Sequence, residues 1–494
     1  MRKNITALLL LFAVSLPLMS QAEEQTAEFL FYEADYWYIE EEDFLEASFL
    51  FKQVLSKEPE NANVKYLLGR CYNNIHGMAE EAIPYFQEAT QDISLKYKAS
   101  KYQVKQAPHD SWFYLADAYR KTNQLTEASM ALDSFSMLRN FEKYYNLEIT
   151  EAAIEQVERA KIIRDAELKL RALYFSEPIN TVRPDYSGVI SADGKMLIWV
   201  TSKALYQAVY MSRREENKWS VPVEITTQIV SDGNLFPTGL SADGNTLLMT
   251  LHPTKGSSEI WYSQYDGMYW SPAQAVFGEI NSNSNEDHAS FSPNGNRIYL
   301  SSDRRGGAGG LDIWYSDKQD DGSWGSPVNM GENINTAEDE TSAYIAPTEG
   351  RFIFASKGHF NMGGYDIFRC EMGNDDIWGQ AVNIGYPINT TSDDTYYVPL
   401  NDGLSALYTR YTREAIGEED LWYVEIQGED GFISDGLILA MDTRQGISSK
   451  DFAIILIDED SGEEIEVIYD AKDDKFKALS GEGKKFRIIS YKQI

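Results

Sequence analysis

The chain has 494 residues, of which 43% are hydrophobic and 13% aromatic, and its formal net charge is −33. The length predicts about two to four domains, and the apolar content excludes a chain that is mainly disordered. The acidity excludes nucleic acid and anionic lipid as partners, because phosphate binding requires clustered Lys and Arg. Such acidity is typical of a solubilising surface, and attraction to a basic partner or weak divalent-cation binding are the alternatives.

Residues 1–22 have the pattern of a secretory signal peptide. Arg2 and Lys3 form the charged start, residues 7–18 the apolar core and residues 20–22 a small-x-small cleavage site. The apolar run is too short to span a bilayer, and no cysteine lies near the cleavage site for a lipid anchor. We therefore expect export to the periplasm in soluble form, with outer-membrane association only through partners.

Residues 23–173 have helical periodicity and contain three related copies of one pattern. The recurring positions, occupied by small and aromatic residues, are Tyr38, Ala47 and Phe51; Gly69, Tyr72, Ala82 and Phe86; and Ala116, Tyr119, Ala128 and Leu132. Small residues let paired helices approach closely, and aromatic residues fill the space between successive pairs. Residues 92–108 are an insertion, and residues 147–173 predict a long capping helix.

This pattern resembles tetratricopeptide repeats, which implies a groove that binds peptides or protein surfaces. Tyr36, Trp37, Trp112 and Tyr114 are the candidate groove residues. Packing between helices is the favoured alternative for each of these aromatic residues.

Residues 174–427 contain five copies of a second pattern, made of short alternating strands and turns. The turns recur at intervals of 50 to 55 residues, at Gly194, Gly244, Gly295, Gly350 and Gly403. Apolar strand cores such as Asp312-Ile313-Trp314 and outer starts such as Trp324-Gly325-Ser326-Pro327 repeat with them. Four strands per copy without intervening helices predict a five-bladed β-propeller.

The ends of the second region indicate how the ring closes. The fifth copy stops after Trp422-Tyr423-Val424 without an outer strand, whereas residues 174–181 precede the first copy and end like the other units. We expect residues 174–181 to supply the missing strand of blade five. The Ser-Pro-Asn-Gly turn and the run from Ser301 to Trp314 resemble TolB-type propeller repeats, which implies the fold but not the function.

Residues 428–494 resume alternating strands and predict a small β-sandwich. Ser461-Gly462-Glu463 and the Asp470–Phe476 hairpin resemble the carboxypeptidase regulatory-like domain, although Asp474-Lys475 replaces the glycine usual in that hairpin. Cys71 and Cys370 fall in different predicted domains, so we expect two buried single thiols and no disulfide.

No catalytic constellation is visible. The five histidines lack metal-ligand spacing, and no Gly-x-Ser-x-Gly elbow is present, so we expect neither an enzyme nor a cofactor. The glycine-rich run from Arg304 to Gly310 joins two strands and opens no helix, which favours a turn over a phosphate site. A group of acidic residues at the starts of blades favours solvated turns, with a calcium site as the alternative: Asp287, Asp303, Asp339, Glu340, Asp393 and Asp394.

The whole order of domains resembles an envelope-protein family of Bacteroidota, without its C-terminal OmpA-like domain. The resemblance implies a non-catalytic periplasmic scaffold that binds envelope proteins, with a link to type IX secretion or gliding as a further implication. Peptidoglycan attachment is not implied here. The alternative is a glycan-binding or glycan-cleaving propeller. The candidate binding residues are Arg304, Arg305, Asp303, Trp37 and Trp112.

Overall fold

The computed structural model describes residues 25–175, 177–215, 218–347, 350–373, 377–401, 403–411, 419–426, 452–458, 464–470, 475–478 and 486–492. The predicted signal peptide lies outside these ranges. The chain divides into two compact units, Met1–Leu115 and Ala116–Ile494.

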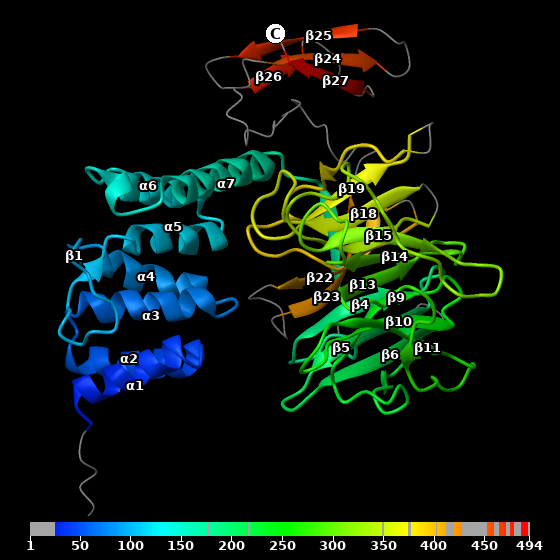
Figure 1. The fold of residues 1–494 in the computed structure, drawn as a ribbon, viewed down its shortest axis with the longest axis horizontal. Coiled ribbons are helices and arrows are strands. Elements are labelled where there is room, and N and C mark those ends of the chain that lie inside the picture. The colour runs from blue at the N-terminus through cyan, green and yellow to red at the C-terminus, as the bar shows by residue number, and fades with distance from the viewer. Residues whose placement is uncertain are drawn as a thin grey trace, which may run out of the picture. The chain divides into compact units, whose positions relative to one another are not determined.

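The N-terminal region consists of paired helices (Figure 1). Helix α1 packs on α2, α2 on α3 and α3 on α4. Side-chain oxygens of Thr26, Asp43 and Asn61 accept hydrogen bonds from backbone N–H groups in the first turns of α1, α2 and α3, which fixes where these helices begin. The elements are α1 Ala27–Ile39, α2 Phe44–Lys57, α3 Ala62–Asn74, α4 Ala79–Ala89, β1 Ile93–Ser94, β2 Ala107–Pro108, α5 Ser111–Lys121, α6 Leu125–Ser136 and α7 Leu147–Asp165.

The small residues of the repeat pattern lie where helices approach closely. A Cβ atom on Gly69 would lie 2.9 Å from the ring of Phe86, so α3 and α4 can pack at this distance only with glycine. Ala47, Ala82 and Ala128 are fully buried at the related positions of the other helices. The prediction of tetratricopeptide-type helices is confirmed.

The insertion before α5 folds back over α1 and α3. Its ends are held together by the parallel pair of β1 and β2. The backbone N–H of Asn63 donates to the carbonyl of Lys105 at 2.9 Å, and the Tyr97 hydroxyl donates to Asn63 Oδ1 at 2.9 Å. Ser100 donates to Asp35 on α1 at 3.2 Å. The insertion therefore covers a face that a bare helical array would leave open.

The predicted propeller region contains five antiparallel sheets, one for each predicted blade, and in each blade the inner strand comes first. Blades one and two are β4 Asp185–Ile190, β5 Met196–Ser202, β6 Gln207–Glu215, β7 Lys218–Trp219 and β8 Val223–Glu224; then β9 Leu235–Leu240, β10 Thr246–Leu251, β11 Glu259–Gln264 and β12 Gln274–Ala275. Blades three and four are β13 Glu286–Phe291, β14 Arg297–Ser302, β15 Asp312–Asp317 and β16 Val328–Asn329; then β17 Glu340–Ile345, β18 Arg351–Ser356, β19 Asp366–Glu371 and β20 Val382–Asn383. Blade five is β21 Tyr397–Leu400, β22 Ser405–Tyr411 and β23 Glu419–Ile426, with β3 Leu170–Tyr174 as its outer strand.

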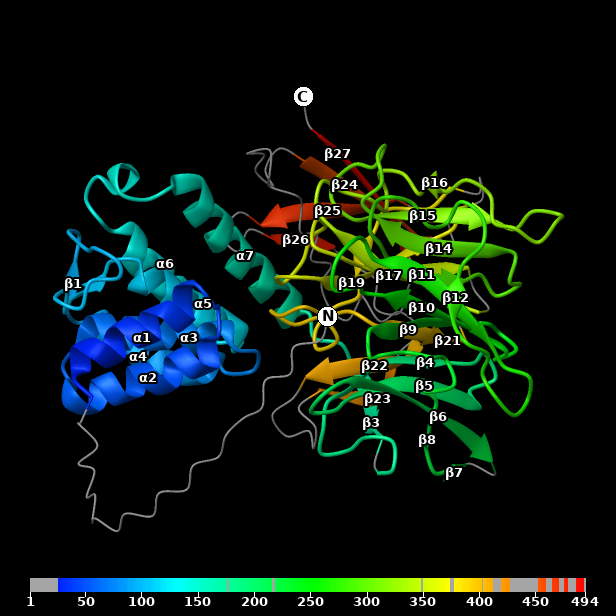
Figure 2. The same ribbon diagram turned by 60° about the horizontal axis from the view of Figure 1, so that its bottom comes forward.

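Strand β3 closes the ring, as Figure 2 shows by its position beside β23. Ala172 lies opposite Val424 in this antiparallel pair. The prediction of a closing strand from before blade one is confirmed, but its position is wrong, because the strand is 170–174 and not 174–181. The later residues of that segment form a loop, in which the Asn180 side chain hydrogen-bonds both the N–H and the C=O of Leu421.

Each interface between neighbouring blades holds its own apolar core. The interface of blades five and one shows this most clearly, because Ile179, Leu197 and Trp199 pack there with Leu407 and Leu421. Four further clusters fill the other four interfaces. Five cores for five interfaces are what a closed ring requires, so the five-bladed propeller is confirmed.

The tail forms one antiparallel sheet in the order β26-β25-β24-β27. Its strands are β24 Phe452–Asp458, β25 Glu464–Asp470, β26 Lys475–Ala478 and β27 Phe486–Lys492. These strands agree with the alternating strands expected in residues 428–494. The second layer of a β-sandwich stays a prediction.

Cys71 and Cys370 are both buried free thiols, as predicted. Burial raises the pKa of each thiol to about 12. Neither thiol is therefore activated for chemistry at neutral pH.

Candidate functional site

Arg304 lies inside blade three and not on its surface. Its side chain is 13% exposed, and its guanidinium lies 3.0 Å from a carboxylate oxygen of Glu286, which is fully buried. The same guanidinium donates to the carbonyl of Ile280 and to the hydroxyl of Ser302. The candidate binding residue Arg304 therefore neutralises a buried acid of its own blade.

Arg305 and Asp303 lie on the surface beside it. Arg305 is exposed, whereas Asp303 accepts hydrogen bonds at 2.7 Å from both the backbone N–H and the side-chain amide of Asn285. The glycine-rich turn that follows is held by Asp312, which accepts from the N–H groups of Ala308 and Gly309 at 2.6 and 3.1 Å. These N–H groups bind a carboxylate of the chain, which agrees with a turn and not with a phosphate cradle.

Four blades share a buried carboxylate that lies at the first residue of the inner strand or, in blade five, three residues before it. In each, the N–H and hydroxyl of a Thr or Ser donate to the carboxylate four residues later; the pairs are Thr181 with Asp185, Ser282 with Glu286, Thr336 with Glu340 and Thr390 with Asp394. Burial raises the pKa of Glu340 and of Asp394 to about 7. The interpretation of Glu340 and Asp394 as solvated turn residues is wrong, since both are buried hydrogen-bond acceptors.

The remaining acids of the calcium hypothesis also have partners in the chain. Asp339 accepts from the N–H of Leu311 at 3.0 Å, Asp393 accepts from the N–H of Tyr365 at 2.9 Å, and Asp287 accepts from Thr341 at 3.1 Å. Within the described residues, no group of three or more His, Cys, Asp or Glu side chains is placed to hold a metal ion. The calcium site has no geometric support in this part of the chain.

His288 is the most deeply buried titratable nitrogen of the propeller. Its Nε2 lies 2.9 Å from the hydroxyl of Tyr344, which donates to the carbonyl of Thr238 at 2.8 Å. Burial lowers the pKa of His288 to about 3, so the ring is neutral at physiological pH. We interpret His288 as a packing residue that joins blades three, four and two.

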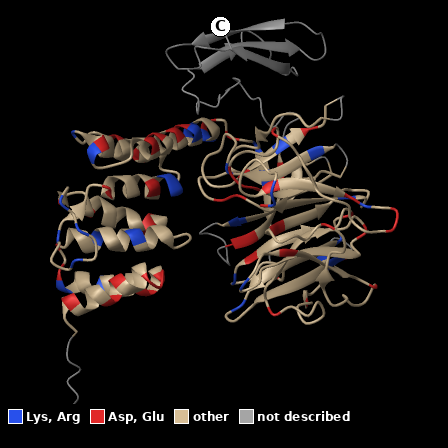
Figure 3. Ribbon diagram, viewed as in Figure 1, with Lys and Arg blue, Asp and Glu red and all other residues tan. Residues whose placement is uncertain are grey.

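An exposed apolar stripe runs along α1. Phe29, Tyr32, Tyr36 and Ile39 are 47%, 43%, 50% and 47% exposed. At 100° per residue they fall within an arc of about 80° on the side of α1 opposite its buried face. We call these four residues the α1 stripe. It is bordered by carboxylates, of which Glu28 lies on one side and Glu33 and Glu40 on the other, and Figure 3 shows acidic residues on both α1 and α2.

The predicted groove aromatics divide between this stripe and the packing around it. Tyr36 belongs to the stripe, and Trp37 is half-buried with its ring edge-on to Tyr36 at 6.0 Å. Tyr114 stacks on Phe86 and lies under the guanidinium of Arg70 at 3.8 Å, so its ring is used in packing. Trp112 on α5 is half-buried.

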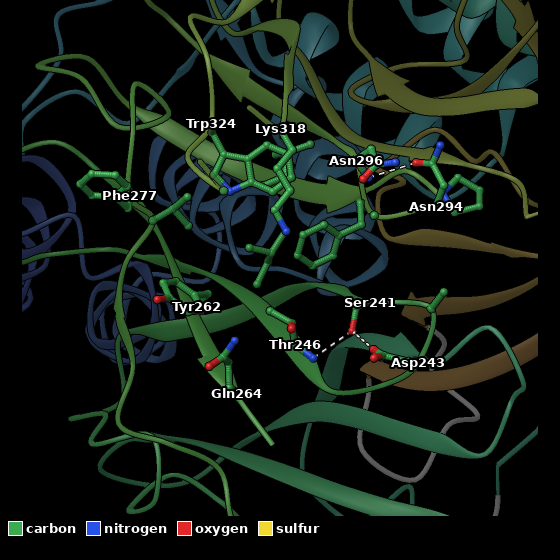
Figure 4. A pocket seen from close by; sticks show the side chains of 18 residues that line it. Ser241, Asp243, Thr246, Tyr262, Gln264, Phe277, Asn294, Asn296, Lys318 and Trp324 are labelled. Atoms are coloured by element: carbon green, nitrogen blue, oxygen red, sulfur yellow. Dashed lines mark hydrogen bonds between the residues drawn. The ribbon is translucent and has the colours of Figure 1, made fainter. Parts of the chain in front are cut away.

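An open cleft of about 540 Å³ lies between blades two and three. Figure 4 shows Tyr262 and Gln264 of β11 on one side and Trp324 and Lys318 of blade three on the other, with Phe277 at the edge. None of the residues predicted for binding lies in this cleft. A comparison of blades two, three and four at the first residue of the second strand and the last residue of the third strand could have revealed it.

Comparisons with known proteins match the two regions separately. The sequence model of the tetratricopeptide repeat matches residues 38–92. TolB from Acinetobacter baumannii is 15% identical over 50% of this chain, with a TM-score of 0.32, and the matched part covers 56% of the TolB chain. An α-L-arabinofuranosidase from Lactobacillus brevis is 11% identical over 54% of this chain and 98% of its own, with a TM-score of 0.37. No curated protein sequence matches the chain.

The described helices also bear on membrane insertion. Among the residues that the structure describes, every helix is too short or too polar to cross a bilayer.

Proposed function

We propose that the protein is a non-catalytic scaffold of the periplasm that binds a basic partner protein through the α1 stripe. The observation that carries the proposal is this stripe of four exposed apolar side chains between acidic borders. Large apolar side chains gathered on one helix face are typical of interaction surfaces. The acidic borders favour a partner with Lys or Arg around its own apolar residues.

The chain's own insertion supports this choice of partner. Residues 63, 66, 70 and 73 of α3 occupy the repeat positions of the α1 stripe, 34 residues later, and Asn63, Tyr66 and Asn73 are buried. The insertion that covers Asn63 and Tyr66 is basic; its lysines are Lys96, Lys98, Lys101 and Lys105. Lys105 forms an ion pair with Glu58 at 2.6 Å. On α3 this face is thus covered by a basic segment that carries tyrosines and by Tyr114 of α5, whereas the same positions on α1 are exposed.

Affinity purification of the full chain from mildly crosslinked cells tests the proposal. The double variant Tyr32→Ser/Tyr36→Ser should recover the specific partner at least tenfold less than the unmodified chain. The control is Leu45→Ser/Phe49→Ser on α2, which removes residues that are 66% and 60% exposed and should recover the partner normally. Equal recovery by the stripe variant and the control would refute the proposed surface.

A further inference from the structure

We propose that the cleft between blades two and three is a binding site for a short saccharide. The inference is independent of the scaffold function, because the cleft and the α1 stripe share no residue. Blades two, three and four share one architecture but differ in the side chains at this surface.

Blades three and four each carry an arginine opposite a carboxylate on their second and third strands. Blade three has Arg297 opposite Asp317, and blade four has Arg351 opposite Glu371. Arg297 makes two hydrogen bonds to Asp317, at 2.7 and 2.9 Å, and its guanidinium lies 4.0 Å above the ring of Tyr315. The long paired side chains cover the aromatic surface in blade three.

Blade two has Thr246 opposite Gln264 at the same positions. Tyr262 occupies the position of Tyr315. Thr246 is too short to cover the ring of Tyr262 as Arg297 covers that of Tyr315. Gln264 has no charge with which to form an ion pair across the strands. Both Thr246 and Gln264 line the cleft. The open aromatic surface therefore results from two side chains that differ from those of blades three and four.

Trp324 completes the cleft, and it occupies in blade three the position that Trp270 occupies in blade two. Trp270, between blades one and two, is 3% exposed and packs in an apolar cluster with Met211. Trp324 is only partly buried and lies 6.4 Å from Phe291, with Lys318 5.8 Å from its ring. The cleft thus presents Trp324, Tyr262 and Phe277 as aromatic surfaces, and Phe277 is 76% exposed.

Several polar groups at the cleft have capacity for a ligand. The side-chain amides of Gln264 and Asn296 and the Tyr262 hydroxyl make no hydrogen bond to another described residue, whereas Asp243 already accepts from Ser241 and Asn245. Amide and ammonium donors beside aromatic faces suit a ring that carries hydroxyl groups on its edge and C–H groups on its faces. A peptide held by its backbone is disfavoured, because β12 at this interface is only two residues long.

The test uses the full chain and four free trisaccharides, namely cellotriose, xylotriose, maltotriose and chitotriose, in calorimetric titration with tryptophan fluorescence as a second readout. The variant Thr246→Arg/Gln264→Asp copies the blade-three pair into blade two and should weaken binding at least tenfold while the protein stays folded. The control Thr246→Ser/Gln264→Asn keeps the cleft open and should bind within about twofold of the unmodified chain.

Two results would overturn the proposal. One is the absence of saturable binding for all four trisaccharides at concentrations up to about 10 mM. This concentration is about a thousandfold above a Kd of about 10 μM, so even a weak site would be detected. The other is unchanged binding in the Thr246→Arg/Gln264→Asp variant when circular dichroism confirms its fold. Tri-alanine, titrated in the same way, probes the peptide alternative. If tri-alanine binds and no trisaccharide does, the cleft is a peptide site and the proposal is refuted.

Discussion

At the scale of single residues, buried polar side chains hold the propeller's loops to its strands. Asn180, Asn281, Asn335 and Asn389 each hydrogen-bond both the N–H and the C=O of one residue in a third strand. Blade one has Thr226 instead, which accepts from the N–H of Val209 at 2.9 Å. Each of these side chains accepts from the N–H of that residue, whereas its C=O also accepts from a backbone N–H, such as that of Met330 for Ile313.

The substitution Asn335→Ala should therefore destabilise the propeller. It leaves the N–H of Ile313 buried without its partner, which costs about 1–3 kcal/mol, whereas the C=O of Ile313 still accepts from the N–H of Met330 at 3.1 Å. Chemical denaturation measures the loss. Asn296→Ala, which removes an exposed side chain without a hydrogen-bond partner among the described residues, should change stability by less than about 0.5 kcal/mol. Equal stability of the two variants would contradict the role assigned to Asn335.

The buried carboxylates predict how stability changes with pH. The pKa of Glu340 is raised to about 7 in the folded protein and is lower in the unfolded chain, so folding favours the protonated form. The contribution of Glu340 to stability is thus fully present below about pH 4.3 and is lost as the pH rises to about 7. Asp394 acts in the same direction.

The variant Glu340→Gln isolates this contribution, because glutamine keeps an oxygen for Thr336 but does not titrate. Thermal melts from pH 4 to pH 8 should show a smaller loss of Tm with rising pH in the variant than in the unmodified chain. Parallel curves for both proteins would show that Glu340 does not titrate in this range.

Residue-scale features were the hardest to predict from the sequence. The spacing of small and aromatic residues was sufficient to place Ala47, Gly69 and Phe86 in helix packing, because this packing is local. The burial of Arg304 depends on Glu286 and on the carbonyl of Ile280, which a distant loop supplies. The openness of the cleft likewise depends on side chains from two blades.

At the scale of elements, closure depends on β3, a strand that lies almost 250 residues from its partner in sequence. The sequence indicated closure correctly, because blade five lacks an outer strand and residues 174–181 end like the other units. It misplaced the strand because that shared ending belongs to the loop around Asn180. The sequence ending that the units share therefore lies in the loop that leads into a blade, and not in the strand that precedes this loop.

A proline in β3 tests this closure. Ala172→Pro removes a donor and disturbs the pairing with β23, which costs about 3 kcal/mol. For a propeller of this size, the Tm should fall by about 6–12 °C. The control Val382→Pro alters β20, an outer strand of two residues that closes nothing, and should give a smaller shift. A larger shift for Val382→Pro would contradict the role of β3.

At the scale of the whole molecule, the negative charge should accelerate encounter with a basic partner. The charge of −33 includes the acids beside the α1 stripe, which an approaching cation meets at close range. Once a partner is purified, its association rate should fall about tenfold between 20 and 200 mM salt, while dissociation changes less. Stopped-flow or surface-resonance kinetics measure both rates, and a salt-independent association rate would exclude a basic partner.

The most direct test of the scaffold function is photo-crosslinking in the cells that produce the protein. A benzoylphenylalanine replaces Tyr36 in the α1 stripe or, in the control, Leu205, which is 95% exposed on the propeller. We predict one dominant crosslinked partner at position 36, with a basic segment at the crosslink, and no such product at position 205. The same crosslinked products at both positions, or none at position 36, would contradict the proposal.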